Sequence, residues 1–173
     1  MPTVTPNLKI KRLTDTAIIP TYAHASDSGM DLYYDGEDID IEPAKFTEVF
    51  SGNCIYRNPN SNPEFTLACD RYLLSTGISI ELPPFTEAQI RPRSGLALKL
   101  GMTVFNAPGT IDEGYKGEIK VMLINLSGKV NLIKRGDRIA QMVICPIFRC
   151  SVQEVDVLEE SHRGVNGFGS TGN

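Results

Sequence analysis

Short runs of alternating or continuous apolar residues dominate this chain and predict a protein built mainly of β-strands. Between residues 74 and 82, apolar or β-branched residues alternate with small or polar ones, which is the period-two pattern of a half-buried strand. Residues 118–126 and 139–148 are apolar on both faces towards their ends, so we expect two central, buried strands there. Residues 8–13 could form an opening strand.

Prolines and glycines divide the chain into short segments. The 11 prolines and 15 glycines favour a compact barrel or sandwich over alternating strands and helices. One short helix is expected over residues 95–100, with Ser94 as its N-cap and Gly101 ending it. Residues 51–71 are rich in Asn, Pro and Ser with little periodicity, which predicts a surface excursion between two strands.

Length and composition are those of one soluble domain. A chain of 173 residues with 41% hydrophobic and 22% charged residues is long enough to bury a core. The net charge of −4 leaves no basic excess to neutralise a nucleic-acid backbone, so we expect no nucleic-acid partner. No apolar run approaches the ~20 residues of a membrane-spanning helix, and the first residues lack the pattern of a secretory signal. We therefore expect a cytoplasmic protein (in the host cytoplasm if it is viral) with no membrane partner.

The four cysteines give little information about function. Cys54, Cys69, Cys145 and Cys150 form no CxxC pair and have no His partner at metal-ligand spacing. Buried thiols are expected, and a Cys54–Cys69 bridge is the less favoured alternative.

Residues 91–99 (RPRSGLALK) place a guanidinium and a hydroxyl at the start of the expected helix. Free backbone N–H groups at a helix N-terminus attract anions, so Arg93 and Ser94 could belong to a phosphate site. The alternative is a basic surface loop with an ordinary cap.

Residues 106–118 contain Pro-Gly and Glu-Gly turn signals around a short apolar run, which predicts a hairpin-like pocket. Asp112 would lie between Ile111 and a turn, where an ionised carboxylate can position and deprotonate a water molecule. Capping of the turn is the alternative role. Tyr115 could lie flat against a sugar, but from this segment alone we favour a place in the core.

Two further segments carry weaker signals. In residues 25–32 (ASDSGMDL), Asp27 and Asp31 could hold metal-bound waters or orient an arginine, or could form a turn that enters a strand. Gln141 is polar among apolar neighbours, so it needs a buried partner and could reach a phosphate.

The C-terminal residues 163–172 (RGVNGFGSTG) combine four glycines with one guanidinium, one aromatic ring and two adjacent hydroxyls. Glycines leave such a segment without intrinsic structure, yet these side chains can grip a phosphate and stack on a flat ring. We interpret the segment as a mobile flap that becomes ordered over a nucleotide. A frayed terminus with an accidental Phe is the alternative.

Taken together and in this order, five segments resemble the five motifs of the trimeric dUTPase family (deoxyuridine triphosphate nucleotidohydrolases). The sequences RPRSGLALK, APGTIDEGYKGEIKV and RGxxGFGSTG carry the most specific part of this resemblance. The five segments are residues 25–32, 91–101, 106–117, 136–141 and 163–172.

The resemblance implies an all-β, jelly-roll-like subunit (a β-clip) assembled as a homotrimer, in which each active site is built from more than one chain. Residues 1–160 would form a single domain, with 51–71 as a surface insertion. Residues 161–173 would form a flexible flap that closes a neighbouring subunit's site. A cyclic trimer makes that exchange equivalent at all three sites.

The implied reaction is the hydrolysis of dUTP to dUMP and pyrophosphate with Mg²⁺ as cofactor, which limits uracil in DNA and supplies dUMP for dTMP synthesis. Asp112 matches the carboxylate that activates the attacking water. The ion would be held mainly by the triphosphate, with Asp31 in its outer hydration shell. Tyr115 matches a residue that stacks on deoxyribose and excludes a 2′-hydroxyl, which overrides the core position favoured above.

The other implied substrate contacts divide between phosphate and base. The phosphate contacts are Arg93, Ser94, Gly95, Gln141 and, in the tail, Arg163, Ser170 and Thr171. The base contacts are Asn106, Gly109, Thr110 and Ile111, with Phe168 covering the uracil beside Gly169 and Lys120 near the base-reading strand.

Two alternatives stay open at this point. A dCTP deaminase, or a bifunctional dCTP deaminase–dUTPase, shares the implied fold, but Tyr115 and the Phe168 tail favour dUTP. A nucleotide-sensing regulatory protein would keep the pocket and signal through residues 51–71, but the intact Asp112 argues against an inactive pocket.

Overall fold

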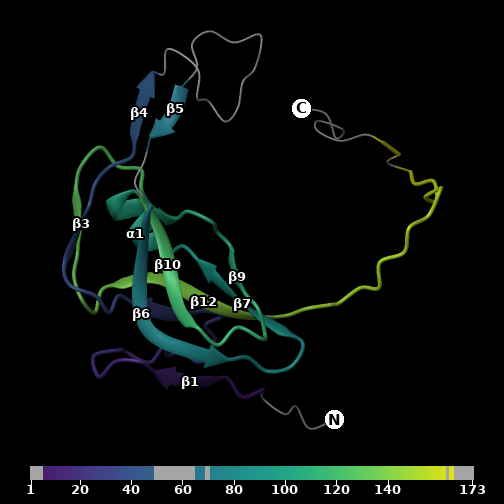
Figure 1. Ribbon diagram of the computed structural model, residues 1–173, viewed down its shortest axis with the longest axis horizontal. Helices are drawn as coiled ribbons and strands as arrows, with labels where there is room; N and C mark the ends of the chain where they lie inside the picture. Colours follow the sequence, from purple (N-terminus) through teal and green to yellow (C-terminus); the bar gives the residue numbers. More distant parts are fainter. Residues whose placement is uncertain (1–5, 49–64, 69–70, 163, 166–173) are drawn as a thin grey trace.

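The computed structural model describes residues 6–48, 65–68, 71–162 and 164–165, and confirms the all-β class with one short helix (Figure 1). The elements are β1 (Lys9–Arg12), β2 (Met30–Tyr33), β3 (Ile39–Ile41), β4 (Lys45–Glu48), β5 (Phe65–Ala68), β6 (Tyr72–Glu81), β7 (Thr86–Arg91), α1 (Ser94–Leu100), β8 (Met102–Val104), β9 (Gly109–Ile111), β10 (Glu118–Asn125), β11 (Asn131–Ile133) and β12 (Arg138–Pro146).

Two antiparallel sheets of four strands form the body. One has the order β1-β6-β10-β8 and the other β2-β12-β7-β9, and the pairs β11-β3 and β4-β5 add two smaller sheets. A single buried cluster contains side chains from both large sheets, among them Ile78 and Ile119 from the first and Leu32, Ile139 and Met142 from the second. The two sheets therefore enclose one hydrophobic core, and its burial is the main favourable contribution to folding.

The predicted central strands are confirmed. β10 lies between β6 and β8, and β12 lies between β2 and β7. The opening strand is also present as β1. The half-buried pattern predicted for β6 is wrong in its middle, where residues on both faces are buried. Gly77 has a positive φ of 65° and lies against Thr14, Ala17 and Asp35, so this strand is covered on its second face too.

The helix begins one residue earlier than predicted. Arg93, with extended backbone, occupies the N-cap position and no side chain caps the helix, so the prediction of Ser94 as N-cap is wrong. Gly101 ends the helix as predicted, with φ of 62° and its N–H donating to the Ala97 carbonyl. A left-handed residue at this position is favourable for glycine because it has no Cβ.

The 51–71 stretch contains one strand that its composition did not predict. β5 lies within it and pairs with β4 in an antiparallel ladder. The remaining residues of the stretch, apart from Arg71, lie outside the described residues, and so do Cys54 and Cys69. Of the other two cysteines, Cys145 is half-buried and Cys150 is exposed, so the expectation of buried thiols is wrong for Cys150.

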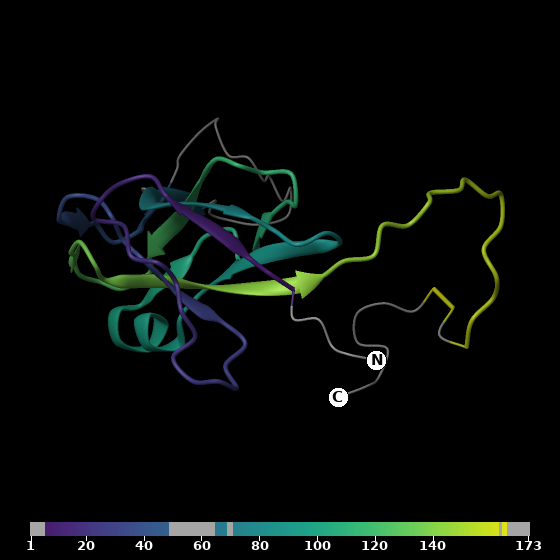
Figure 2. The same ribbon diagram turned by 90° about the horizontal axis from the view of Figure 1, so that it is seen from below.

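Beyond β12 the chain leaves the body as an extended arm, residues 147–162 (Figures 1 and 2). Phe148 is 96% and Val152 95% exposed, so these apolar side chains of the arm do not pack on the body of their own chain. In the part of the chain that the structure describes, no helix is long and apolar enough to cross a bilayer.

Candidate active site

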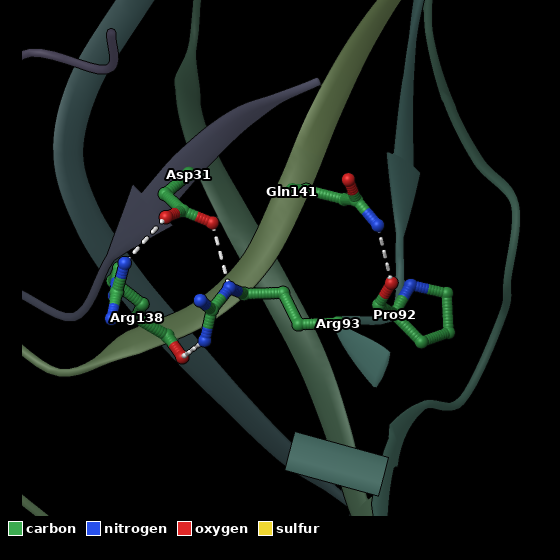
Figure 3. Close-up of polar contacts among 5 residues, drawn as sticks. All are labelled: Asp31, Pro92, Arg93, Arg138 and Gln141. Atoms are coloured by element: carbon green, nitrogen blue, oxygen red, sulfur yellow. Dashed lines mark hydrogen bonds and ion pairs between the residues drawn. The ribbon is translucent and has the colours of Figure 1, made fainter. Parts of the chain in front are cut away.

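Three charged residues from separate elements meet at one end of the second sheet (Figure 3). Arg93, at the start of α1, donates from Nε to Asp31 Oδ1 at 2.6 Å. Arg138, at the start of β12, donates from Nη1 to Asp31 Oδ2 at 3.1 Å. Arg93 also donates from Nη1 to the Arg138 carbonyl at 3.3 Å. We call these three residues the arginine cluster.

The topology explains why the arginine cluster forms. Gln141 on β12 lies opposite Asp31 on one side and opposite Arg91 on the other, and Arg93 lies two residues beyond Arg91, the last residue of β7. The side chains of Asp31 and Arg93 are only 19% and 23% exposed, whereas Arg138 is 53% exposed. Two guanidinium groups share one carboxylate, so the cluster keeps one net positive charge and suits an anionic ligand.

A cavity of about 280 Å³ lies beside this cluster and is lined by Asp27, Ser28, Gly29, Asp31, Arg91, Gln141 and two apolar residues. Gln141 donates from Nε2 to the Pro92 carbonyl at 2.8 Å, which supplies the partner that the sequence required. A Cβ at Gly29 would lie 2.6 Å from Gln141 Oε1, so glycine allows this close approach. Asp27 accepts the His24 N–H at 2.8 Å, which is the predicted turn role.

The predicted short strand is present as β9, but no β-hairpin forms in this described part of the chain, because β9 lies in another sheet than its sequence neighbours β8 and β10. β9 pairs with β7, with Thr110 opposite Gln89 and Ile111 opposite Ala88. Asp112 follows β9 directly and is exposed. Its carbonyl accepts the Tyr115 N–H at 3.0 Å, which closes a turn over residues 112–115. Gly109 is buried, and a Cβ there would lie 3.1 Å from Asn106 Nδ2, so the amide of Asn106 lies against the start of the strand.

A second cavity, of about 320 Å³, is lined by Leu73, Thr110, Ile111, Asp112, Tyr115, Glu118 and Lys120. The core position that we favoured for Tyr115 from its segment alone is wrong, because the residue is 46% exposed. Its hydroxyl donates to the Glu118 carbonyl at 3.0 Å. A Cβ at Gly117 would lie 2.5 Å from this hydroxyl, so glycine leaves room for the phenol over the turn.

The two cavities have no lining residue in common. β7 lies between β12, which lines the first, and β9, which lines the second. The structure therefore brings Asp31, Arg93 and Gln141 together, and separately gathers Thr110, Ile111, Asp112, Tyr115 and Lys120.

Five predicted residues lie outside both linings, and another five lie outside the described residues. Two of the first five are Arg93, which belongs to the arginine cluster, and Gly109, which begins β9. Ser94 and Gly95 are exposed at the start of α1, with open space around Gly95, and Asn106 lies beside Gly109. The residues whose placement is not described are Arg163, Phe168, Gly169, Ser170 and Thr171.

The sequence alone did not single out two residues that make direct contacts beside the cavities, Arg138 and Glu113. Arg138 belongs to the segment 136–141, but nothing in its spacing predicted that it would share Asp31 with Arg93. Glu113 was read only as part of a turn signal, whereas its carboxylate accepts two hydrogen bonds from distant residues. Both contacts depend on pairings between strands that are far apart in the sequence.

The donor set fits a Mg²⁺ ion carried by a phosphate substrate. Among the described residues no group of three His, Cys, Asp or Glu side chains could hold a metal ion. Mg²⁺ typically keeps several waters and is bound by one or two carboxylates together with substrate phosphates. Asp27 and Asp31 both line the first cavity. Both oxygens of Asp31 already accept guanidinium N–H groups, so these carboxylates suit contact with the waters of a hydrated ion rather than direct ligation.

The fold and these two cavities define a β-rich protein with two candidate sites. The arginine cluster could bind an anion, and the second cavity contains the exposed carboxylate of Asp112. Comparison with known proteins gives the family.

A dUTPase family model matches residues 60–172 of this chain. Deoxyuridine 5′-triphosphate nucleotidohydrolase of Clostridium tetani (strain Massachusetts / E88) is 50% identical over 165 residues, which is 95% of this chain and 96% of that protein. The protein of the same name from Clostridioides difficile is 46% identical over 166 residues, covering 96% and 98%. The chain belongs to the dUTPase family.

Solved structures show the same fold. The dUTPase of Staphylococcus bacteriophage 80alpha, in a complex with dUPNHPP, superposes with a TM-score of 0.73 at 23% identity and covers 98% of this chain and 100% of that one. A dUTPase from phage phi11 of S. aureus, described with a structural Mg(II) ion, has a TM-score of 0.67 at 20% identity and covers 89% and 99%.

Proposed function

We propose that this chain is a dUTP diphosphatase that hydrolyses dUTP to dUMP and pyrophosphate in the cytoplasm. Family membership supports the reaction. The observation that carries the assignment of residues is the position of Asp112, which is exposed at the end of β9 in a cavity that also contains Tyr115.

In this proposal Asp112 accepts a proton from the water that attacks the α-phosphorus. A bond forms from the water oxygen to phosphorus, and the bond from phosphorus to the oxygen that bridges to the β-phosphate breaks. Pyrophosphate leaves with that oxygen. Guanidinium groups stabilise the charge that develops on phosphoryl oxygens, and Arg93 and Arg138 carry the groups that suit this role.

Substrate selection in this proposal depends on the second cavity. The β9 backbone from Gly109 to Asp112 would read the edge of uracil, with Asn106 supporting the start of the strand. The ring of Tyr115 would stack on deoxyribose and leave no room for a 2′-hydroxyl. A ribonucleotide would then be rejected, because its 2′-hydroxyl would clash with the ring and prevent productive binding.

The C-terminal residues would complete the site from a neighbouring chain. Phe168 would cover the uracil, while Arg163, Ser170 and Thr171 would bind the γ-phosphate. Closing of such a flap excludes water from the reacting groups. The exposed arm of residues 147–162, which leaves its own body (Figure 2), supports this arrangement.

Mg²⁺ would be held mainly by the triphosphate, with the carboxylates of Asp27 and Asp31 in its outer hydration shell. When bound, the ion neutralises part of the charge that an acidic protein would otherwise repel.

We further propose a homotrimer in which the two cavities of one chain contribute to different active sites. This would explain why the arginine cluster and the Asp112 cavity have no lining residue in common, because each would face its counterpart on another copy. The mass of the protein in solution tests this arrangement directly, since a monomer would rule it out.

The function is tested by incubating the protein with dUTP and, separately, with dCTP, and measuring ammonia and pyrophosphate independently. We expect pyrophosphate from dUTP and no ammonia from either nucleotide. Ammonia from dCTP would identify a deaminase instead. Binding of dUTP without any product would favour a nucleotide-sensing regulatory protein.

A further inference from the structure

Glu113, the residue after Asp112, is bonded to two distant parts of the fold. Its Oε2 accepts the backbone N–H of Phe85 at 3.1 Å and an N–H from Nη2 of Arg149 at 2.8 Å. Phe85 lies in the turn between β6 and β7, and Arg149 lies at the root of the C-terminal arm. One carboxylate oxygen therefore ties the turn that follows β9 to both of these segments.

The backbone of Phe85 completes this connection. Its carbonyl accepts the N–H of Ile147 at 2.9 Å, so Phe85 is bonded to Glu113 through its N–H and to the arm through its C=O. Phe85 has a positive φ of 61°. A non-glycine residue keeps such a conformation only where its surroundings fix it, and these two hydrogen bonds are contacts that do so.

The side chain of Asp112 is exposed and makes no hydrogen bond with any residue that the structure describes, so its position depends on the turn that carries it. Within the turn, the Tyr115 N–H donates to the Asp112 carbonyl, and Lys116 Nζ donates to the Glu113 carbonyl at 3.3 Å. Both of these contacts join residues of the turn to each other. The side chain of Glu113, 28% exposed, joins the turn to the rest of the body.

We propose that Glu113 is a positioning residue for Asp112 and that Arg149 couples this position to the C-terminal arm. The inference rests on the proposed function, in which Asp112 activates water. The ion pair holds the turn and the arm root in one arrangement. Without it, Asp112 samples more orientations, and fewer of them align with the attacking water. Because the residues that line the cavity are unchanged, turnover falls while the KM for dUTP stays nearly constant.

The test uses the full-length chain with Glu113→Gln, Arg149→Gln and the double variant. Gln at position 113 can still accept the Phe85 N–H, so the fold is kept while the ion pair is lost. We expect each single variant to lower kcat by about tenfold, since small misplacements of reacting groups reduce rates strongly. KM should change by less than about twofold, and the double variant should be no slower than the slower single one, because both changes break one interaction.

Lys9→Gln is the matched control. It breaks the exposed Lys9–Glu81 ion pair of 2.6 Å between β1 and β6, and kcat should not change. Unchanged kcat in both Glu113→Gln and Arg149→Gln, or losses that multiply in the double variant, would refute the positioning role and leave the dUTPase assignment intact. A wild-type chain that fails to hydrolyse dUTP would instead reject the dUTPase assignment, and the positioning role with it.

Discussion

The arginine cluster and the Asp112 turn differ in how their charged groups are held. In the cluster, both oxygens of Asp31 already accept guanidinium N–H groups, from Arg93 and Arg138 (Figure 3). In the turn, Asp112 is exposed and its side chain has no partner among the described residues. The fold thus assembles the cationic region through direct contacts between side chains, whereas the turn that carries Asp112 is held by backbone hydrogen bonds and by the side chain of Glu113.

The difference has a chemical reason. Charged groups that bind phosphate work best when they are already in place, since no reorganisation is then needed during the reaction. A general base must keep a lone pair free for the proton that it accepts. Asp31 therefore suits a supporting role, and Asp112 suits proton transfer.

The largest expected effect comes from Asp112→Asn. The amide keeps the shape of the side chain but cannot act as the base, so we expect turnover of dUTP to fall by about 1,000-fold. Binding of dUTP should change by only a few-fold, because the cavity stays intact. Release of pyrophosphate and calorimetric binding measure the two effects separately. Normal hydrolysis by this variant would remove the chemical distinction between the two regions.

Arg93→Ala tests the other region. It leaves Asp31, which is 19% exposed, with Arg138 alone, and we expect the free energy of unfolding to fall by about 1–3 kcal/mol. Loss of a charge-assisted phosphate contact should also lower kcat/KM for dUTP by about 100-fold. Urea unfolding and steady-state kinetics measure both. Arg93→Lys keeps the positive charge but loses the planar guanidinium group, so its kcat/KM should lie between those of wild type and Arg93→Ala. A wild-type kcat/KM in Arg93→Ala would argue against a phosphate-binding role for Arg93.

Tyr115→Ala should relax sugar selection with a smaller effect. Removal of the ring opens the second cavity, so we expect the preference for dUTP over UTP to fall by about 10- to 100-fold. Tyr115→Phe keeps the ring and loses only the hydrogen bond to the Glu118 carbonyl, so it should retain the preference. Competition between the two nucleotides gives the ratio. An unchanged ratio in Tyr115→Ala would place sugar selection elsewhere.

Glu81→Gln provides a baseline outside both regions. The hydrogen bond from Lys9, followed by the charges of Lys9 and Lys116, holds the pKa of Glu81 below its ordinary value of 4.5. A carboxylate with a lowered pKa in the folded state stabilises the protein above the unfolded pKa, and this contribution is lost as the pH falls through the folded one. Wild type should therefore lose slightly more stability than the variant as the pH is lowered below 4.5, while turnover at neutral pH stays equal. Parallel acid-unfolding curves would contradict this.

The sequence predicted local features well where one segment determined them. The strands around residues 74–82, 118–126 and 139–148 follow from periodicity, and the end of the helix at Gly101 follows from the tolerance of glycine for positive φ. The position of Asp112 beside a turn follows from its neighbours in the same way. These features need no knowledge of the distant chain.

Features that depend on tertiary contacts could not be predicted in this way. The helix starts at Ser94 because Arg93 is extended, with its side chain directed to Asp31, and this partner is 62 residues away in the sequence. Tyr115 is apolar enough for a core, but Gly117 lets its ring lie at the surface. The contacts of Glu113 form only because the β6–β7 turn and the start of the C-terminal arm lie beside it.

The measurement that tests the central claim most directly mixes two inactive chains. In the proposed trimer, Asp112 of one copy and Arg93 of another serve the same site. Asp112→Asn and Arg93→Ala chains would be unfolded together in equal amounts and refolded. Random assembly then places intact Asp112 and intact Arg93 in about a quarter of the sites, so we predict recovery of about a quarter of the wild-type rate. A mixture no more active than the two variants refolded separately would contradict a site shared between chains.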